Sequence, residues 1–239
     1  MIWDKFKTMF HPSWHSKIRP FIESEECNKI YAFLKSESKK GKQIAPQSIH
    51  LWRCFLETSL DNLKVVMVGM APYHTFKNDL PVADGLLMGC SITNQLQPTL
   101  QKFYSGLEKE LYDGLNLSYI INTDVSYLAK QGVLMLNASL SVEINKAESH
   151  LDVWEPFIKY LFEEILNVTG VPIIFLGKDS AKYKKYAGTI CPTFTLPHPA
   201  SASYKGTDWN TEGVFSKVDE LLEESNGFGI QWLDIDIPF

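Results

Sequence analysis

The chain of 239 residues carries a formal net charge of −5 at pH 7, which excludes a uniformly basic nucleic-acid-binding protein, so any contact with nucleic acid is expected to be local. A hydrophobic fraction of 45% and a charged fraction of 21% are ordinary for a globular protein and exclude a disordered chain. This length fits one large domain that spans residues 1–239 and buries a sizeable core.

Residues 1 to about 60 are predicted to be mainly helical. Residues 20–33 carry apolar side chains at helical spacing, with acidic residues near the start of the segment. Residues 36–47 are polar and rich in lysine, which predicts a surface connection. Residues 75–98 are expected to form a long loop, and a helix is expected from residue 98 to about residue 111.

Four apolar segments are predicted to form buried strands, near residues 65, 133, 173 and 193. Helical patterns separate them, with the clearest at residues 153–168, so the connections are expected to be parallel crossovers. The predicted fold class is therefore α/β, a single domain with a central four-stranded, mainly parallel sheet flanked by helices. Residues 227–239, which include Trp232 and Phe239, are expected to pack back on this body.

Three of these strands end in polar side chains. The strand near residue 65 leads into a loop that carries Tyr73 and His74, the next strand ends at Asn137, and the last leads to His198 between two prolines. Open α/β sheets bind their ligands at the carboxyl edge. A carboxamide can pair with an imide N–H and the neighbouring carbonyl, and an imidazole N–H can bind an oxygen on which charge develops. These groups suit the edge of a pyrimidine.

Residues 69–74 read Gly-Met-Ala-Pro-Tyr-His, residues 134–137 read Leu-Met-Leu-Asn, and residues 198–202 read His-Pro-Ala-Ser-Ala. In these segments the chain resembles the uracil-DNA glycosylases, whose loops read Gly-Gln-Asp-Pro-Tyr-His, Leu-Leu-Leu-Asn and His-Pro-Ser-Pro-Leu. The resemblance continues through residues 44–46, 51–55, 98–104, 129–138, 147–150 and 214–217, a breadth that chance motif matches do not reach. It implies the fold of that family and hydrolysis of the N-glycosidic bond of deoxyuridine in DNA, as in base excision repair.

The resemblance also implies roles for individual residues. Tyr73 would exclude thymine by blocking the C5 position, Asn137 would pair with the imide edge of uracil, and His198 would stabilise the departing anion at O2. Outside these motifs, the same residues would be interpreted as a packed tyrosine, a turn-forming cap and a capping histidine. Met70 and Met88 stand in the implied base pocket where the family has Gln and an aromatic ring. The implied DNA-contacting positions are Thr99, Lys178, Pro199, Ser201 and Ala202.

The main departure from the family is Ala71, which stands where the family has the Asp that activates water. Residues 200–202 also lack the Leu wedge of the family's minor-groove loop. Asp79 and Asp84 are candidates for a substitute carboxylate, although aspartates in loops are usually surface residues. Three hypotheses follow: a glycosylase with impaired activity, a catalytically inactive homologue that binds DNA or scaffolds a replication protein, and a glycosylase for another modified base whose pocket is reshaped by Met88 and residues 75–82.

The four cysteines are scattered and form no C-x-x-C pair, so no metal, cluster or other cofactor is expected. Neither a secretory signal nor an apolar stretch long enough for a membrane span is visible, which predicts a cytoplasmic location, or a nuclear one in a eukaryotic or virus-infected cell. The expected partner is uracil-containing DNA, single- or double-stranded, bound by a monomer. The basic runs at residues 39–42 and 178–185 would contact it, unless they are solvated surface. A replication protein is a further candidate partner.

Overall fold

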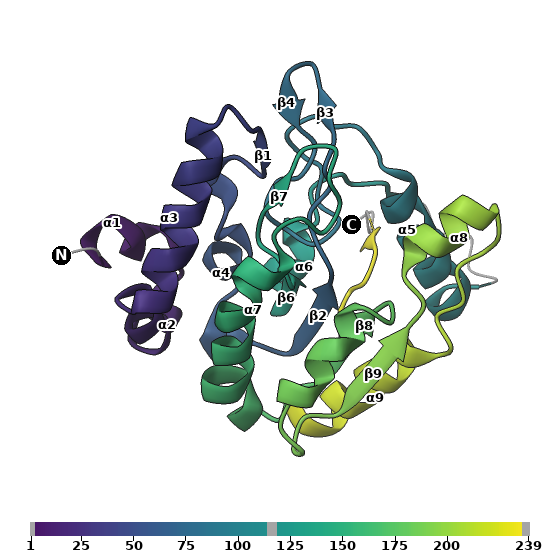
Figure 1. The fold of residues 1–239 in the computed structure, drawn as a ribbon. Helices are drawn as coiled ribbons and strands as arrows, with labels where there is room; N and C mark the ends of the chain where they lie inside the picture. Colours follow the sequence, from purple (N-terminus) through teal and green to yellow (C-terminus); the bar gives the residue numbers. More distant parts are fainter. Residues whose placement is uncertain (1–2, 114–118, 236–239) are drawn as a thin grey trace.

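The computed structural model describes residues 3–113 and 119–235 and shows an α/β fold built on a four-stranded sheet (Figure 1). Gly69 lies beside Asn137 and Leu176 beside Leu196, so the strands bring their carboxyl ends to one edge of the sheet. The predicted fold class is confirmed, and every strand pair in this sheet is parallel. The strands, in sheet order, are β6 (Val133–Asn137), β2 (Val65–Gly69), β8 (Ile173–Leu176) and β9 (Thr193–Leu196).

Burial explains the composition of the strands. Every residue of β2, β6 and β8 is buried, and these strands are near-continuous runs of Val, Ile, Leu, Met and Phe, as expected where both faces of a sheet are covered. β9 lies at the sheet edge, and only Leu196 of its four residues is buried. β9 still pairs with β8 over its full length, which directs the following residue pair, Pro197 and His198, to the carboxyl edge.

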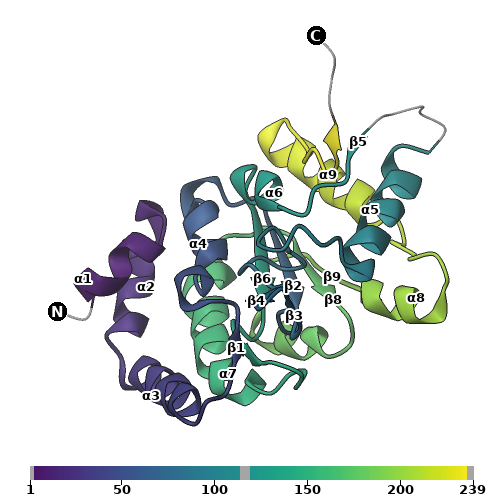
Figure 2. The ribbon, with the colours of Figure 1, turned by 90° about the horizontal axis from the view of Figure 1, so that it is seen from above.

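The helices gather on two opposite flanks, as the view from above shows (Figure 2). On one flank lie α1 (Trp3–Phe6), α2 (His15–Ile22) and α3 (Glu25–Lys39), and on the other lie α5 (Pro98–Leu111), α8 (Pro199–Lys205) and α9 (Val214–Asn226). Two short helices, α4 (Arg53–Glu57) and α6 (Ser126–Lys130), contact β6, while α7 (Leu151–Tyr160) contacts α3. Within the described residues, none of these helices has the length and apolar character of a membrane span.

Short elements complete the fold. Three antiparallel strand pairs are β1 (Ile44–Ala45) with β7 (Val142–Glu143), β3 (Phe76–Lys77) with β4 (Leu80–Pro81), and β5 (Tyr119–Ile120) with β10 (Asp234–Ile235). The helix α7 continues into one π-helical turn, Leu161–Ile165, and a 3₁₀ turn, Leu166–Val168. The remaining 3₁₀ turns span Lys7–Met9, Pro12–Trp14, Ser48–His50, Leu60–Asn62 and Ser180–Tyr186.

The prediction for residues 20–47 was wrong in two respects. The continuous helix expected over residues 20–33 is divided, because Ser24 adopts an extended backbone and its side chain accepts a hydrogen bond from the Cys27 N–H at 3.2 Å, which starts a new helix. That helix then extends to Lys39, into the segment expected to be a surface connection. Glu37 near its end is buried and forms ion pairs with Lys40 and Lys42.

The C-terminal segment packs on the body, as predicted, as far as the structure describes it. Trp232 is fully buried, its ring lies 4.8 Å from that of Phe215, and its N–H donates to Asp219 at 2.9 Å. The backbone N–H of Ile230 donates to the same carboxylate at 2.9 Å. Phe239 lies outside the described residues.

Candidate active site

A cavity of about 350 Å³ opens at the carboxyl edge of the sheet. This volume falls in the range of small-molecule sites and suits a single nucleobase. Its walls come from the loop that follows β2, the turn before α7, the end of β8 and the first residues of α8. The cavity is lined by Met70, Ala71, Pro72, Tyr73, His74, Thr99, Ala147, Glu148, Leu176, Gly177, Asp179, His198, Ala200, Ser201 and Tyr204.

The loop after β2 places Ala71 and Tyr73 on the cavity wall. Pro72 between them is buried and cannot donate to a sheet ladder, so the strand that ends at Gly69 does not resume in this loop. The Tyr73 hydroxyl is buried near Thr99 and the Leu100 N–H but meets hydrogen-bond geometry with neither of them. Burial raises the pKa of Tyr73 far above its ordinary value, so the ring presents a neutral phenol.

His198 is held in one orientation and one protonation state. It is the N-cap of α8, and its Nδ1 accepts a hydrogen bond from the Ala200 N–H at 3.1 Å. Burial lowers the pKa of His198 below 6.5, so the ring is neutral at pH 7. Because Nδ1 is the acceptor, we assign the proton to Nε2, which leaves an N–H donor for a ligand. Gly177, with φ of 95°, faces this side chain, and a Cβ there would lie 3.3 Å from His198 Cβ.

Asn137 is buried at the end of β6, and its Oδ1 accepts no hydrogen bond from the described residues. A buried acceptor without a partner is costly, so such groups commonly mark a ligand site. The strand ends stay paired beyond Asn137, because the N–H groups of Ala138 and Ser139 donate to the carbonyls of Gly69 and Met70 at 2.9 and 2.8 Å. Asn137 is not among the cavity-lining residues but lies against Gly69, the residue before Met70: a Cβ on Gly69 would be 3.3 Å from Asn137 Oδ1.

The other predicted site residues occupy different surroundings. Met70, Thr99 and Ser201 line the cavity. Pro199 and Ala202 are buried in α8, and Lys178 is exposed between the cavity-lining residues Gly177 and Asp179. Met88 is 5% exposed, has an unusual backbone φ of 61° and does not line the cavity. Their roles toward DNA and base stay predictions.

Neither proposed substitute carboxylate lies in the cavity. Asp79 is exposed in the turn between β3 and β4. Asp84 is completely buried, forms an ion pair with Arg53 at 2.8 Å and accepts hydrogen bonds from the Leu86 N–H and from the N–H and hydroxyl of Ser91. Its carboxylate oxygens are thus used to hold the loop after β4. The hypothesis that Asp79 or Asp84 replaces the missing carboxylate in the cavity is therefore wrong.

This assignment of Asp84 predicts a large loss of stability on mutation. Replacing Asp84 by Ala leaves Arg53 with a buried charge that, among the residues the structure describes, Asp124 at 2.8 Å and Glu57 still neutralise. We expect the free energy of unfolding to fall by about 3–5 kcal/mol, the usual cost of removing one partner of a buried pair. Urea denaturation measures this value. Asp61→Ala, at an exposed carboxylate, serves as control and should change it by less than about 0.5 kcal/mol. Equal effects of the two mutations would contradict the assignment.

Three cavity residues were not found from the sequence. Glu148 and Asp179 place carboxylates at the mouth, and Tyr204 places an aromatic ring there that is 90% exposed. The stretch 147–150 resembles the family, but the sequence assigned no role to Glu148, Asp179 or Tyr204, because each reaches the cavity through the packing of a separate element. Tyr204 follows the segment that lacks the family's Leu wedge, on the same short helix as Ser201.

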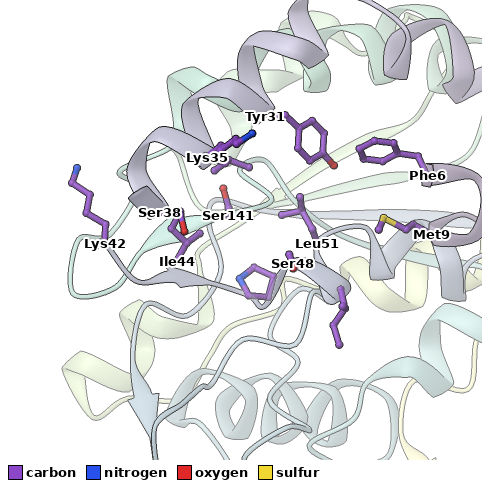
Figure 3. A pocket seen from close by; sticks show the side chains of 13 residues that line it. Phe6, Met9, Tyr31, Lys35, Ser38, Lys42, Ile44, Ser48, Leu51 and Ser141 are labelled. Carbon is purple, nitrogen blue, oxygen red and sulfur yellow. The ribbon is translucent and has the colours of Figure 1, made fainter. Parts of the chain in front are cut away.

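A second hollow, of about 470 Å³, lies away from these residues, between α3 and the segment that includes β1 (Figure 3). Its floor is apolar, with Phe6, Met9 and Leu51, and Lys35 and Lys42 lie at its rim. Lys42 belongs to the basic run predicted to contact DNA, but none of the residues assigned to the base or to catalysis lines this hollow, so the chemistry inferred from the sequence belongs to the cavity at the sheet edge.

The protonation of His198 predicts how stability changes with pH. Between the folded-state pKa and 6.5, the unfolded chain binds more protons at this ring than the folded protein does. The stability that depends on the neutral ring is therefore complete above pH 6.5 and is lost as pH falls from 6.5 toward the folded-state pKa. Thermal unfolding over this interval should show a falling Tm, and His198→Asn should reduce the slope. Burial also lowers the pKa of His150, so part of the dependence of Tm on pH should remain in that variant. An unchanged slope would count against a neutral His198.

Comparisons with known proteins agree with this geometry. The model of the uracil DNA glycosylase superfamily matches residues 56–223. Uracil-DNA glycosylase from Streptococcus pyogenes serotype M18 is 31% identical over 230 residues, which cover 94% of this chain and 100% of that protein. The enzyme of the same name from Shewanella oneidensis is 33% identical over 224 residues, or 91% of this chain and 95% of the relative.

The fold is also similar to that of solved structures. The crystal structure of mimivirus uracil-DNA glycosylase matches with a TM-score of 0.81 and 20% sequence identity, and the match covers 95% of this chain and 88% of that one. The resemblance inferred from the strand-end motifs is thereby confirmed. By its sequence match and by its fold, the chain belongs to the uracil-DNA glycosylase superfamily.

Proposed function

We propose that the protein is a slow uracil-DNA glycosylase, which hydrolyses the N-glycosidic bond of deoxyuridine in DNA. The observation that carries this proposal is the neutral His198, whose Nδ1 is capped by the Ala200 N–H so that Nε2–H is available at a cavity of nucleobase size. The absence of a carboxylate at Ala71 reduces the rate without removing the other groups of the site.

The residues around the cavity support the selection of uracil. The unpartnered Oδ1 of Asn137 can accept the imide N–H, and its amide N–H can donate to the neighbouring carbonyl. The Tyr73 ring on the cavity wall would collide with a methyl group at C5 and so exclude thymine. As the glycosidic bond breaks, charge accumulates on the base, and the Nε2–H of His198 stabilises it at O2 more strongly than in the ground state. Base recognition of this kind requires that the nucleotide be extruded from the stack.

A cleavage assay tests the proposal. The protein, in excess over a labelled oligonucleotide with one uracil, should produce abasic sites that alkali converts to strand breaks, in both single-stranded and duplex DNA. An oligonucleotide with thymine at the same position should stay intact. If strand breaks are absent but the oligonucleotide is bound, the protein is a binding homologue and the proposed activity is wrong. Breaks at another modified base, without breaks at uracil, would redirect the assignment to that base.

The position of Tyr204 predicts a contribution to DNA binding. Its ring is exposed beside the cavity, on a helix fixed at its start by hydrogen bonds from Ser201 Oγ to the His198 carbonyl and from Trp209 Nε1 to the Pro197 carbonyl, both at 2.7 Å. Stacking of a base on an aromatic ring contributes about 1–3 kcal/mol. Tyr204→Ala should therefore weaken DNA binding by about 10- to 100-fold, and Tyr204→Phe should not.

Fluorescence anisotropy with a labelled uracil-containing duplex measures this effect. Phe228→Ala provides a control, because Phe228 is also a largely exposed aromatic residue, 74% exposed, and lies outside the cavity lining. A similar loss of affinity in both alanine variants would indicate a nonspecific effect of lost aromatic surface. No loss in Tyr204→Ala would exclude a stacking role.

A further inference from the structure

Glu148 shares a cavity with Ala71 and His198 but belongs to a different segment of the chain. It lies in the turn between β7 and α7 and is exposed to solvent. Ala71 contributes only a methyl group to the same space. The carboxylate that is absent from the loop after β2 can thus be supplied from a neighbouring wall.

Backbone hydrogen bonds hold this turn beside the loop that carries Ala71. The Asn145 N–H donates to the His74 carbonyl at 2.8 Å, and the Glu143 N–H donates to Ser149 Oγ at 2.8 Å. The backbone of Glu148 has a φ of 62°, a conformation that residues other than glycine adopt infrequently. Its carbonyl accepts the Leu151 N–H at 3.2 Å. The backbone of Glu148 is therefore fixed relative to the cavity.

The Glu148 carboxylate is also unengaged. Within the described residues, it takes part in neither a hydrogen bond nor an ion pair, and Lys182 interacts with it only electrostatically. Asp179, the other carboxylate on the cavity wall, forms an ion pair with Lys182 at 2.6 Å. A carboxylate with neither a hydrogen bond nor an ion pair can turn toward a bound water, whereas the Asp179 carboxylate is held by Lys182.

We infer that Glu148 activates the attacking water; this inference rests on the proposed glycosylase function. The water oxygen bonds to C1′ of the deoxyribose as its proton passes to the Glu148 carboxylate. The C1′–N1 bond breaks, and its electron pair leaves with the base as the uracil anion, stabilised at O2 by the Nε2–H of His198. Glu148 then returns its proton to the anion through solvent. The products are uracil and an abasic site, with no oxidant or reductant consumed.

Single-turnover and steady-state kinetics of Glu148→Gln test this role. A catalytic carboxylate predicts a fall in kcat of about 10²-fold, the lower end of the range for positioned acid–base groups. If Glu148 only repels the substrate, Glu148→Gln should instead lower KM and leave kcat unchanged, because loss of a negative charge at the mouth favours binding of a polyanionic substrate. Asp152→Asn is the matched control: it removes an exposed carboxylate from the first turn of α7, outside the cavity lining, and should leave kcat unchanged. Glu148→Asp should retain part of the activity.

A double variant separates catalysis from structure. If Ala71→Asp supplies a carboxylate, adding Glu148→Gln to it should change kcat by less than about threefold, since either carboxylate then suffices, in line with the non-additivity of groups that share one task. If the wild-type protein releases uracil and Glu148→Gln does so with the same kcat, the inference is wrong and the proposed function stands. If the wild-type protein itself does not release uracil, both are wrong, whatever Ala71→Asp does.

Discussion

Replacing Ala71 by Asp is expected to raise kcat for uracil release by about 10²-fold. Ala71 lines the cavity beside His198, so an Asp at this position places a carboxylate at the reacting centre on the loop that follows the central strand β2. Positioned acid–base groups contribute about 10²–10⁴-fold, and the lower value applies because Glu148 already supplies part of this effect. Single-turnover assays with a uracil-containing oligonucleotide measure the change.

Ala71→Asn is the control for this gain, since its side chain has nearly the same shape as that of Asp and cannot take up the proton of water. Its kcat should stay near that of the wild-type protein. A gain in both variants would mean that side-chain volume, not the carboxylate, limits the reaction. If Ala71→Asp binds DNA but, like the wild-type protein, releases no uracil, the inactive, DNA-binding homologue is favoured over the slow enzyme.

Replacing His198 by Ala is expected to lower kcat by about 10²–10³-fold. The Nε2–H of His198 is the donor assigned to the departing anion, and loss of one donor of this kind has a cost of that size. The mutation also removes the acceptor of the Ala200 N–H, the N-cap of α8. We therefore expect an additional loss of about 1 kcal/mol in stability.

His198→Asn separates the two effects. Asn is a strong N-cap residue, so its Oδ1 can accept the Ala200 N–H, while its short side chain does not extend as far toward the cavity as Nε2 does. Both variants should lose activity to a similar extent, and only His198→Ala should show a lower stability in thermal unfolding above pH 6.5. Full activity in His198→Asn would mean that His198 acts only as a cap.

The sheet could be predicted from the sequence because its burial leaves a local signal. Strands covered on both faces are runs of apolar residues, and β2, β6 and β8 have this composition over their whole length. The residues that follow these strands were equally visible, since they are contiguous in sequence with a recognisable strand. Ser24, which divides the predicted N-terminal helix, carried a signal that was overlooked: it is a preferred capping residue and precedes two glutamates.

The errors concern residues whose surroundings are set by distant parts of the chain. Asp84 was a candidate base because its loop follows Ala71, but its partner Arg53 belongs to an earlier helix, and nothing near Asp84 in the sequence indicates that ion pair. Glu148 was overlooked for the converse reason: it reaches the cavity through the hydrogen bond that joins Asn145 to the loop at His74. Such encounters depend on topology and become visible only in three dimensions.

The strands that position the site residues differ in how deeply they are buried. Tyr73 follows β2 in the middle of the sheet and Asn137 ends the fully buried β6, whereas His198 follows β9, the rim strand with three of its four residues partly or fully exposed. Local opening begins where burial is least. Under mild denaturant, amide protons of β9 should therefore exchange before those of β2 and β6. Tyr73 and Asn137 would then still hold the base in place when His198 no longer stabilises the departing anion.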